Sequence, residues 1–243
     1  MSDPFIHHPE LRDKITDPSR SFFRDFDARD VFSQQPGLSW VVDMLRTPEQ
    51  RAECREAVIA DRRDDHLWVF AYGSLMWDPA FEFRQVRRGR IEGYSRGFIL
   101  KDIYGARGTV EQPGLMAALE TGSGCDGLVF QIERNKIEIE TEIIWRREMA
   151  FPCYIPTLVT VDTGGEMIEA LTFVADHSAD AMHPHLTHEE QVQFLATGKG
   201  FLGSSMEYLE NIVSHFSALD ILDEHCEILL RDAQAFSRAN QAA

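Results

Sequence analysis

The stretch LWVFAYGSL, residues 67–75, contains a short apolar run that stops at a glycine. Residues 67–72 are continuously apolar, and a run of that length bounded by a glycine is typical of a buried strand. Gly73 then permits a tight turn, and the backbone N–H groups of such a turn can converge on an anion. The stretch therefore predicts a buried strand that ends in a turn over residues 72–75.

Further short strands are expected after this one, separated by Gly, Pro and Ser residues. Two of them flank the turn Asp162-Thr163-Gly164-Gly165. Many short strands at such spacing favour a barrel or a closed, strongly bent sheet. The expected strands cover residues 86–94, 98–103, 115–120, 127–133, 157–161 and 167–174.

Helices are expected on both sides of the strand-rich region. Thr47-Pro48-Glu49-Gln50 is a capping box with proline at the first helical position, and it predicts a helix over residues 48–62. Residues 136–148 alternate isoleucine with glutamate as a strand does, but Asn135 is a good N-cap and Ile139 and Ile143 lie four apart, which favours a helix. Capping boxes at 187–190 and 204–207 predict a helical last third, with helices over 188–197, 205–218 and 223–235.

The chain is expected to have three parts within an α+β fold class. Residues 1–65 read as an N-terminal arm and helix of unknown role, because residues 3–36 are polar, mixed and weakly periodic. Residues 66–235 hold the strands and most of the helices, and residues 236–243 form a C-terminal tail.

Composition narrows the function classes. The formal net charge is −16, which repels phosphate backbones and anionic lipid and so argues against nucleic-acid and membrane partners. The sequence has no apolar run of about 18 residues and no secretory signal layout, so the expected location is the cytoplasm. The four cysteines are scattered without CxxC spacing and are expected to be reduced and buried.

Three segments contain candidate functional residues. The turn Tyr72–Gly73–Ser74–Leu75 can bind an anion, although an ordinary strand-to-loop turn has the same pattern. Arg107 can pair bidentately with a carboxylate, as an amino-acid-like ligand would require, or it can be a surface arginine. Glu148 lies in the segment WRREM with apolar neighbours that can desolvate it and raise its pKa, which suits proton transfer; the alternative is a surface glutamate paired with an arginine.

Four histidines, at positions 177, 183, 185 and 188, invite a metal hypothesis. The helical H-x-x-x-H and H-E-x-x-H spacings are missing, and Pro184 interrupts the segment. A solvated loop is therefore favoured over a metal site.

Taken in order, these motifs resemble the ChaC family of glutathione-specific γ-glutamylcyclotransferases. The ordered set covers about residues 66–235, and it is specific although each motif alone is not. It consists of YGSLMW (72–77), GYSR (93–96), RGT (107–109), PGL (113–115), WRREM (145–149) with Tyr154, and Gly203-Ser204 with Tyr208-Leu209.

The resemblance implies a γ-glutamylcyclotransferase-like small mixed β-barrel with flanking helices and a helical C-terminal segment, and a catalytic domain over residues 66–235. It implies conversion of glutathione to 5-oxoproline and cysteinylglycine with neither metal nor organic cofactor. In such enzymes the turn, here Tyr72 to Leu75, grips the γ-glutamyl group, and the glutamate of the Arg-Glu pair, here Glu148, is the acid/base. The tyrosine of the late helix, here Tyr208, lines the site.

Two departures from the family pattern stand out. Residues 150–153, AFPC, are bulkier than the small residues expected after the glutamate, and residues 1–65 extend beyond the family core. Two other functions fit the same motifs. One is cyclisation of other γ-glutamyl amines or amino acids, and the other is a non-catalytic regulator on the same fold, against which the presence of Glu148 argues.

Overall fold

The computed structural model describes residues 3–62 and 65–241. By compactness the chain divides into two units: unit 1 is residues 1–95 with 119–176, and unit 2 is residues 96–118 with 177–243. Neither unit is a continuous piece of chain. The part boundaries expected at residues 65 and 235 stay predictions, and residues 1–2, 63–64 and 242–243 of the expected arm and tail lie outside the described part.

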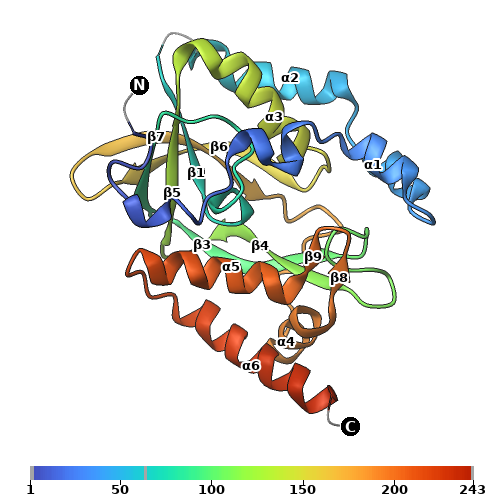
Figure 1. Ribbon diagram of the computed structural model, residues 1–243. Helices are drawn as coiled ribbons and strands as arrows, with labels where there is room; N and C mark the ends of the chain where they lie inside the picture. Colours follow the sequence, from blue (N-terminus) through green and yellow to red (C-terminus); the bar gives the residue numbers. More distant parts are fainter. Residues whose placement is uncertain (1–2, 63–64, 242–243) are drawn as a thin grey trace. The chain divides into compact units, whose positions relative to one another are not determined.

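Unit 1 contains a closed barrel of five strands (Figure 1). Around the barrel, β1 pairs with β5, β5 with β2, β2 with β6, and β6 with β7, all antiparallel. A parallel pairing of β7 with β1, at Leu171 and Val69, closes the ring. The expected barrel is therefore confirmed. Its strands are β1 (Leu67–Ala71), β2 (Gln85–Ile91), β5 (Cys125–Ile132), β6 (Tyr154–Asp162) and β7 (Met167–Ala175).

Apolar side chains fill the barrel and give β1 its burial pattern. Four of the five residues of β1 are buried, as the continuous apolar run predicts. One core cluster joins residues from all five strands to Tyr72, the residue that follows β1. The cluster contains Phe70, Tyr72, Ile91, Leu119, Cys125, Val129, Val159, Val161 and Ala170.

Two helices of unit 1 pack on each other, α2 (Pro48–Ile59) and α3 (Ile137–Glu148) (Figure 1). Thr47 caps α2 with the expected capping box, and its hydroxyl oxygen accepts a bond from the Gln50 N–H. Residues 137–148 are helical, as favoured, because one face of α3 buries Ile137, Ile143 and Ile144 while Ile139 faces solvent. Both helices are confirmed, but α2 ends at Ile59 and continues as a 3-10 helix, and Asn135 lies within the 3-10 helix Arg134–Lys136 instead of capping α3.

The part of the arm before α2 is made of short pieces rather than of long periodic ones. It contains the helix α1 (Ala28–Gln34) and buries Leu11, Ile15, Phe26 and Phe32. Short 3-10 helices make up much of the remainder, which explains the weak periodicity of the sequence. In unit 1 the 3-10 helices are Pro9–Leu11, Pro18–Arg20, Phe22–Arg24, Ser39–Met44, Ala60–Arg62, Ser74–Met76 and Arg134–Lys136.

Unit 2 contains three helices that pack on one another. They are α4 (His188–Thr197), α5 (Ser205–Ala218) and α6 (Glu224–Gln241), and the first two have the predicted bounds while α6 is longer than expected. A short hairpin, β8 (Lys199–Gly200) with β9 (Gly203–Ser204), precedes α5.

The strands β3 (Tyr94–Asp102) and β4 (Gly114–Thr121) are hydrogen-bonded neighbours, and the chain passes between the units within each of them. The single strand expected over residues 86–94 is wrong in one respect. β2 ends at Ile91, the chain bends at Glu92–Gly93, and Tyr94 already belongs to β3. Gly93 has φ +82°, a conformation that glycine adopts readily. None of the described helices is both long and apolar enough to cross a membrane.

Candidate active site

The turn after β1 is a 3-10 helix, Ser74–Met76. The Met76 N–H donates to the Gly73 carbonyl at 2.9 Å, and the Asp78 N–H donates to the Ser74 carbonyl at 3.0 Å. The first N–H groups of a helical turn have no acceptor within that turn. The expected tight turn after Gly73 is thus present, and its role in binding an anion stays a prediction.

The side chains of Tyr72 and Leu75 are buried within unit 1. The Tyr72 ring belongs to the barrel core, and its hydroxyl donates a 2.8 Å bond to the carbonyl of Phe173 on β7. Tyr72 thus ties the start of the turn to the barrel wall, and the Ser74 hydroxyl remains as the polar side chain of the turn.

Glu148 is the last residue of α3, and its side chain is 15% exposed. Burial raises the pKa of its carboxyl above the usual range, while the neighbouring charge of Arg147 opposes the rise. The C-terminal end of a helix also disfavours a negative charge. A carboxyl group in this position exchanges its proton closer to neutral pH than a solvated glutamate does.

Arg147 joins Glu148 to the turn. Its Nε lies 3.1 Å from Glu148 Oε1, and its guanidinium donates a 2.7 Å bond to Ser74 Oγ. A further bond goes to the Asp78 carbonyl, and the Phe23 ring covers the guanidinium at 3.9 Å. The side chain is 7% exposed, so these contacts fix it. The arginine of the Arg-Glu pair is therefore a structural link that sequence reasoning did not single out.

In unit 2, Arg107 and Tyr208 lie together. The Arg107 guanidinium lies 5.1 Å from the centre of the Tyr208 ring and donates a 2.9 Å bond to the Ser204 carbonyl. Ser204 is the N-cap of α5, and its hydroxyl accepts from the Glu207 N–H in the expected capping box. Arg107 is thus a buried arginine at the start of α5 rather than a surface residue.

Asp102 organises the loop that carries Arg107. Its buried carboxylate accepts bonds from the backbone N–H groups of Tyr104 at 2.8 Å, of Gly108 at 3.0 Å and of Arg107. Burial raises the pKa of the Asp102 carboxyl, and the three backbone donors oppose that rise. Sequence reasoning missed this residue. The available signal was an aspartate at the start of a loop, whose carboxylate can accept a bond from the backbone N–H two residues later and so form an Asx turn.

The structure thus brings the predicted site residues together in two groups. Tyr72, Gly73, Ser74, Leu75 and Glu148 belong to unit 1, and Arg107 and Tyr208 belong to unit 2. Within the described residues, no group of three or more His, Cys, Asp or Glu side chains could hold a metal ion, and His188 pairs with Asp232 at 2.9 Å. All four cysteines are free, and three of them are buried.

Known proteins share both the sequence and the fold of this chain. A glutathione-specific γ-glutamylcyclotransferase of Escherichia coli is 32% identical over 219 residues, which cover 87% of this chain and 90% of the relative. Glutathione-specific γ-glutamylcyclotransferase 1 of Rattus norvegicus is 31% identical over 172 residues, which cover 68% of this chain and 77% of the relative.

The crystal structure of a glutathione-specific γ-glutamyl cyclotransferase from yeast superposes with a TM-score of 0.63 at 18% identity. The match covers 71% of this chain and 99% of the yeast chain, and it confirms the expected γ-glutamylcyclotransferase-like fold. The model of the family described as ChaC-like protein matches residues 67–235, which begin at β1 and include the turn, Glu148, Arg107 and Tyr208. The chain therefore belongs to the ChaC family.

Proposed function

We propose that this protein is a γ-glutamylcyclotransferase that degrades glutathione to 5-oxoproline and cysteinylglycine. The observation that carries the proposal is the Glu148 carboxyl, which has a raised pKa and is joined through Arg147 to the Ser74 turn. Glutathione is proposed as the substrate because the E. coli and rat relatives are named glutathione-specific. An enzyme of this kind needs one proton-transferring group and a means of folding its substrate.

The substrate carries its own nucleophile. The α-amino group of the γ-glutamyl residue attacks the γ-carbonyl carbon, a five-membered ring closes, and the amide bond to the cysteinyl nitrogen breaks. No enzyme nucleophile is required, and none is assigned here. Burial raises the pKa of the Cys153 thiol to about 12, so this cysteine is not proposed to take part in the reaction.

Glu148 takes the proton from the substrate ammonium group and delivers one to the leaving cysteinyl nitrogen. Its raised pKa suits both transfers, because an acid/base acts best when its pKa lies near the working pH. The N–H groups of the Gly73–Leu75 turn bind the substrate carboxylate or the developing oxyanion. Holding the chain folded gives the amine an effective molarity of about 10⁵ M or more.

Arg107 and Tyr208 are proposed as substrate-binding residues. Arginine pairs with carboxylates in a planar, bidentate geometry, and glutathione carries two carboxylates. The proposed partners are limited to this small-molecule substrate, and the proposed location is the cytoplasm, where reduced thiols such as the four free cysteines are usual.

The test is to incubate the purified protein with glutathione and to quantify 5-oxoproline and cysteinylglycine, which should form in equal amounts. Glutathione acetylated on its α-amine is the matched control, because it keeps the amide but lacks the nucleophile and should give no product. Release of cysteinylglycine from the acetylated compound would reveal hydrolysis instead. γ-Glutamylalanine and γ-glutamyl-lysine, run beside glutathione, measure how strictly the enzyme chooses its substrate.

A further inference from the structure

Residues of the arm contact the residues that come just before Glu148 in the sequence and those that come just after it. The family match begins only at residue 67, so the arm lies outside it. Yet residues of the arm contact the last turn of α3 and the segment that follows it. These contacts belong to unit 1 throughout.

On the helix side, the 3-10 helix Phe22–Arg24 contacts two successive arginines of α3. The Phe23 ring lies 3.9 Å from the centre of the Arg147 guanidinium, and the carbonyl of Arg24 accepts a 2.8 Å bond from Arg146. A cation on an aromatic face is attracted to it, and more strongly where water is excluded. Phe23 therefore restrains the guanidinium that contacts both Ser74 and Glu148.

An ion pair fastens this part of the arm two turns further back on α3. The Arg24 guanidinium pairs with the buried carboxylate of Glu140, which also accepts a 2.9 Å bond from the Glu82 N–H. Breaking such a pair leaves a buried charge without its partner and is strongly destabilising. This pair contributes to the stability of unit 1, whereas Phe23 contacts the functional arginine itself.

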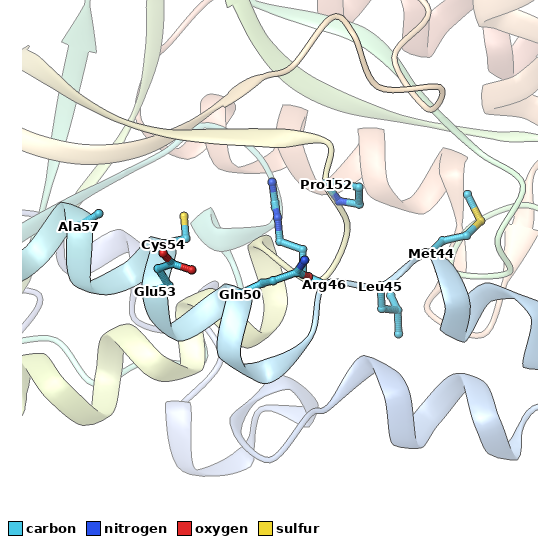
Figure 2. Close-up of a pocket in the computed structure, with 8 residues that line it drawn as sticks. All are labelled: Met44, Leu45, Arg46, Gln50, Glu53, Cys54, Ala57 and Pro152. Carbon is cyan, nitrogen blue, oxygen red and sulfur yellow. The ribbon is translucent and has the colours of Figure 1, made fainter.

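On the other side, Arg46 holds the residues directly after Glu148. Its backbone N–H donates a 2.8 Å bond to the carbonyl of Ala150, and its guanidinium donates a 2.8 Å bond to the carbonyl of Phe151. Arg46 and Pro152 also line a hollow of about 450 Å³ (Figure 2). The two hydrogen bonds from Arg46, together with the packing of the Phe151 ring on Phe32 of α1, hold residues 150–151 against the arm.

We propose that Phe23 and Arg46 are positioning residues through which the arm sets the place of the Glu148 carboxylate. The proposal rests on the function proposed above. Phe23 acts through Arg147, and Arg46 acts through residues 150–151. A proton transfer needs its donor and acceptor within hydrogen-bond reach, and a misplacement of about 1 Å can cost 100-fold in rate.

The test compares two variants with two matched controls. Phe23→Ala removes the ring under Arg147, and Phe5→Ala removes an arm ring that lies 5.3 Å from the guanidinium of Arg12 and packs on Phe83. Arg46→Met removes the bond to Phe151, and Arg55→Met removes an arm arginine that donates to the Glu138 carbonyl and to Thr141 on the first turns of α3. Each variant is assayed well below its own melting temperature.

We expect kcat for glutathione to fall about 10- to 100-fold in Phe23→Ala and Arg46→Met, with KM changed less than about threefold. Phe5→Ala and Arg55→Met should keep the wild-type kcat even where they melt earlier. Phe23→Tyr, which keeps the aromatic face, should restore most of the rate, and Phe23→Leu should restore less.

Equal kcat values in the two variants and their controls would overturn the positioning role, as would a loss of rate that follows melting temperature across all four. If Phe23→Ala or Arg46→Met does not fold, Phe23→Leu and Arg46→Lys carry the same comparison. A wild-type protein that forms no 5-oxoproline from glutathione would instead refute the proposed function, so the two failures are distinct.

Discussion

Arg147, near the end of α3, donates a 2.7 Å hydrogen bond to the hydroxyl oxygen of Ser74, which lies 73 residues earlier in the chain. The same guanidinium lies 3.1 Å from the carboxylate of Glu148. One side chain therefore connects the turn that is proposed to bind the substrate with the proposed acid/base. The contributions of Ser74 and Glu148 to the rate should therefore be coupled through Arg147.

Glu148→Gln should lower kcat by about 10²- to 10⁴-fold, because the amide cannot transfer a proton. Glu142→Gln, at an exposed position of the same helix, makes the same change in charge and should keep the rate. Activity of Glu148→Gln close to that of the wild type would remove Glu148 from its proposed role.

The same variant should be no less stable than the wild type at pH 7. Because the pKa of the Glu148 carboxyl is raised in the folded protein, that state holds the proton more tightly than the unfolded chain, whose glutamates titrate at about 4.3. The contribution of this carboxyl group to the stability of the wild type is therefore fully present below about pH 4.3. It is lost as pH rises through the raised pKa of the folded protein. Melting temperatures of the two proteins from pH 4 to 8 should diverge in favour of the glutamine variant as pH rises.

Ser74→Ala and Arg147→Lys should not have additive effects on kcat/KM. Lysine keeps the charge of Arg147 but cannot reach Ser74 and the Asp78 carbonyl together with the planar fork that the present contacts use. A double-mutant cycle should give a coupling energy of about 0.5–3 kcal/mol, as for residues in direct contact. Additivity within experimental error would mean that the hydrogen bond has no part in catalysis.

Arg107→Gln should raise KM for glutathione about 10-fold or more while kcat changes little, because a charge-assisted contact with a substrate carboxylate is worth about 1.5–3 kcal/mol. Arg96→Gln is the control. Arg96 is another buried arginine of unit 2, which pairs with Asp223 at 2.7 Å and lies 4.5 Å from the Phe216 ring. Kinetic constants unchanged from the wild type in Arg107→Gln would exclude Arg107 from substrate binding and leave it the structural contact with Ser204.

Asp102→Asn should lower the free energy of unfolding by about 1–3 kcal/mol, because the new amide presents a donor where backbone N–H groups already point. Asp162→Asn serves for comparison, since that exposed carboxylate accepts a single bond from the Gly164 N–H at 2.8 Å. Denaturant unfolding of both variants measures the difference. Equal stabilities would show that the Arg107 loop does not depend on Asp102.

A thiol reagent at pH 8 should modify Cys54 of the native protein and leave Cys153 unmodified. Burial raises the pKa of the Cys153 thiol to about 12, so its reactive thiolate is scarce, whereas Cys54 is only half-buried. Native Cys54→Ser protein should therefore react very slowly, and the unfolded wild type should expose four thiols. Rapid native labelling of Cys153 would contradict its burial.

Local signals in the sequence predicted the helices and most strands. Capping boxes at Thr47, Thr187 and Ser204 involve residues three apart, so they can be recognised without knowledge of the fold. The apolar run before Gly73 likewise predicted β1. The turn at Glu92–Gly93 was missed because the apolar and β-branched residues on either side read as one strand.

Tertiary contacts could not be predicted in this way. No periodicity or spacing in the sequence indicates contacts that form only when the chain folds. Examples are the bond from Tyr72 to Phe173, the three donors around Asp102 and the position of Phe23 under Arg147. Similarly, the arm has short 3-10 helices whose period differs from that of an α-helix. Glu148 and the turn were found as a pair through their resemblance to a family, while the arginine that joins them is visible only in the structure.

The hydroxyl of Tyr72 finds its acceptor 101 residues later in the chain, on the strand whose pairing with β1 completes the barrel. During synthesis, the turn is therefore made long before the structure that supports it, and its conformation must wait for β7 to leave the ribosome. Contacts so distant in sequence form slowly, because a long loop must close first. A nascent chain that stops before residue 175 has the turn and the glutamate of the proposed site but no closed barrel to hold them, so activity should arise only near the end of folding.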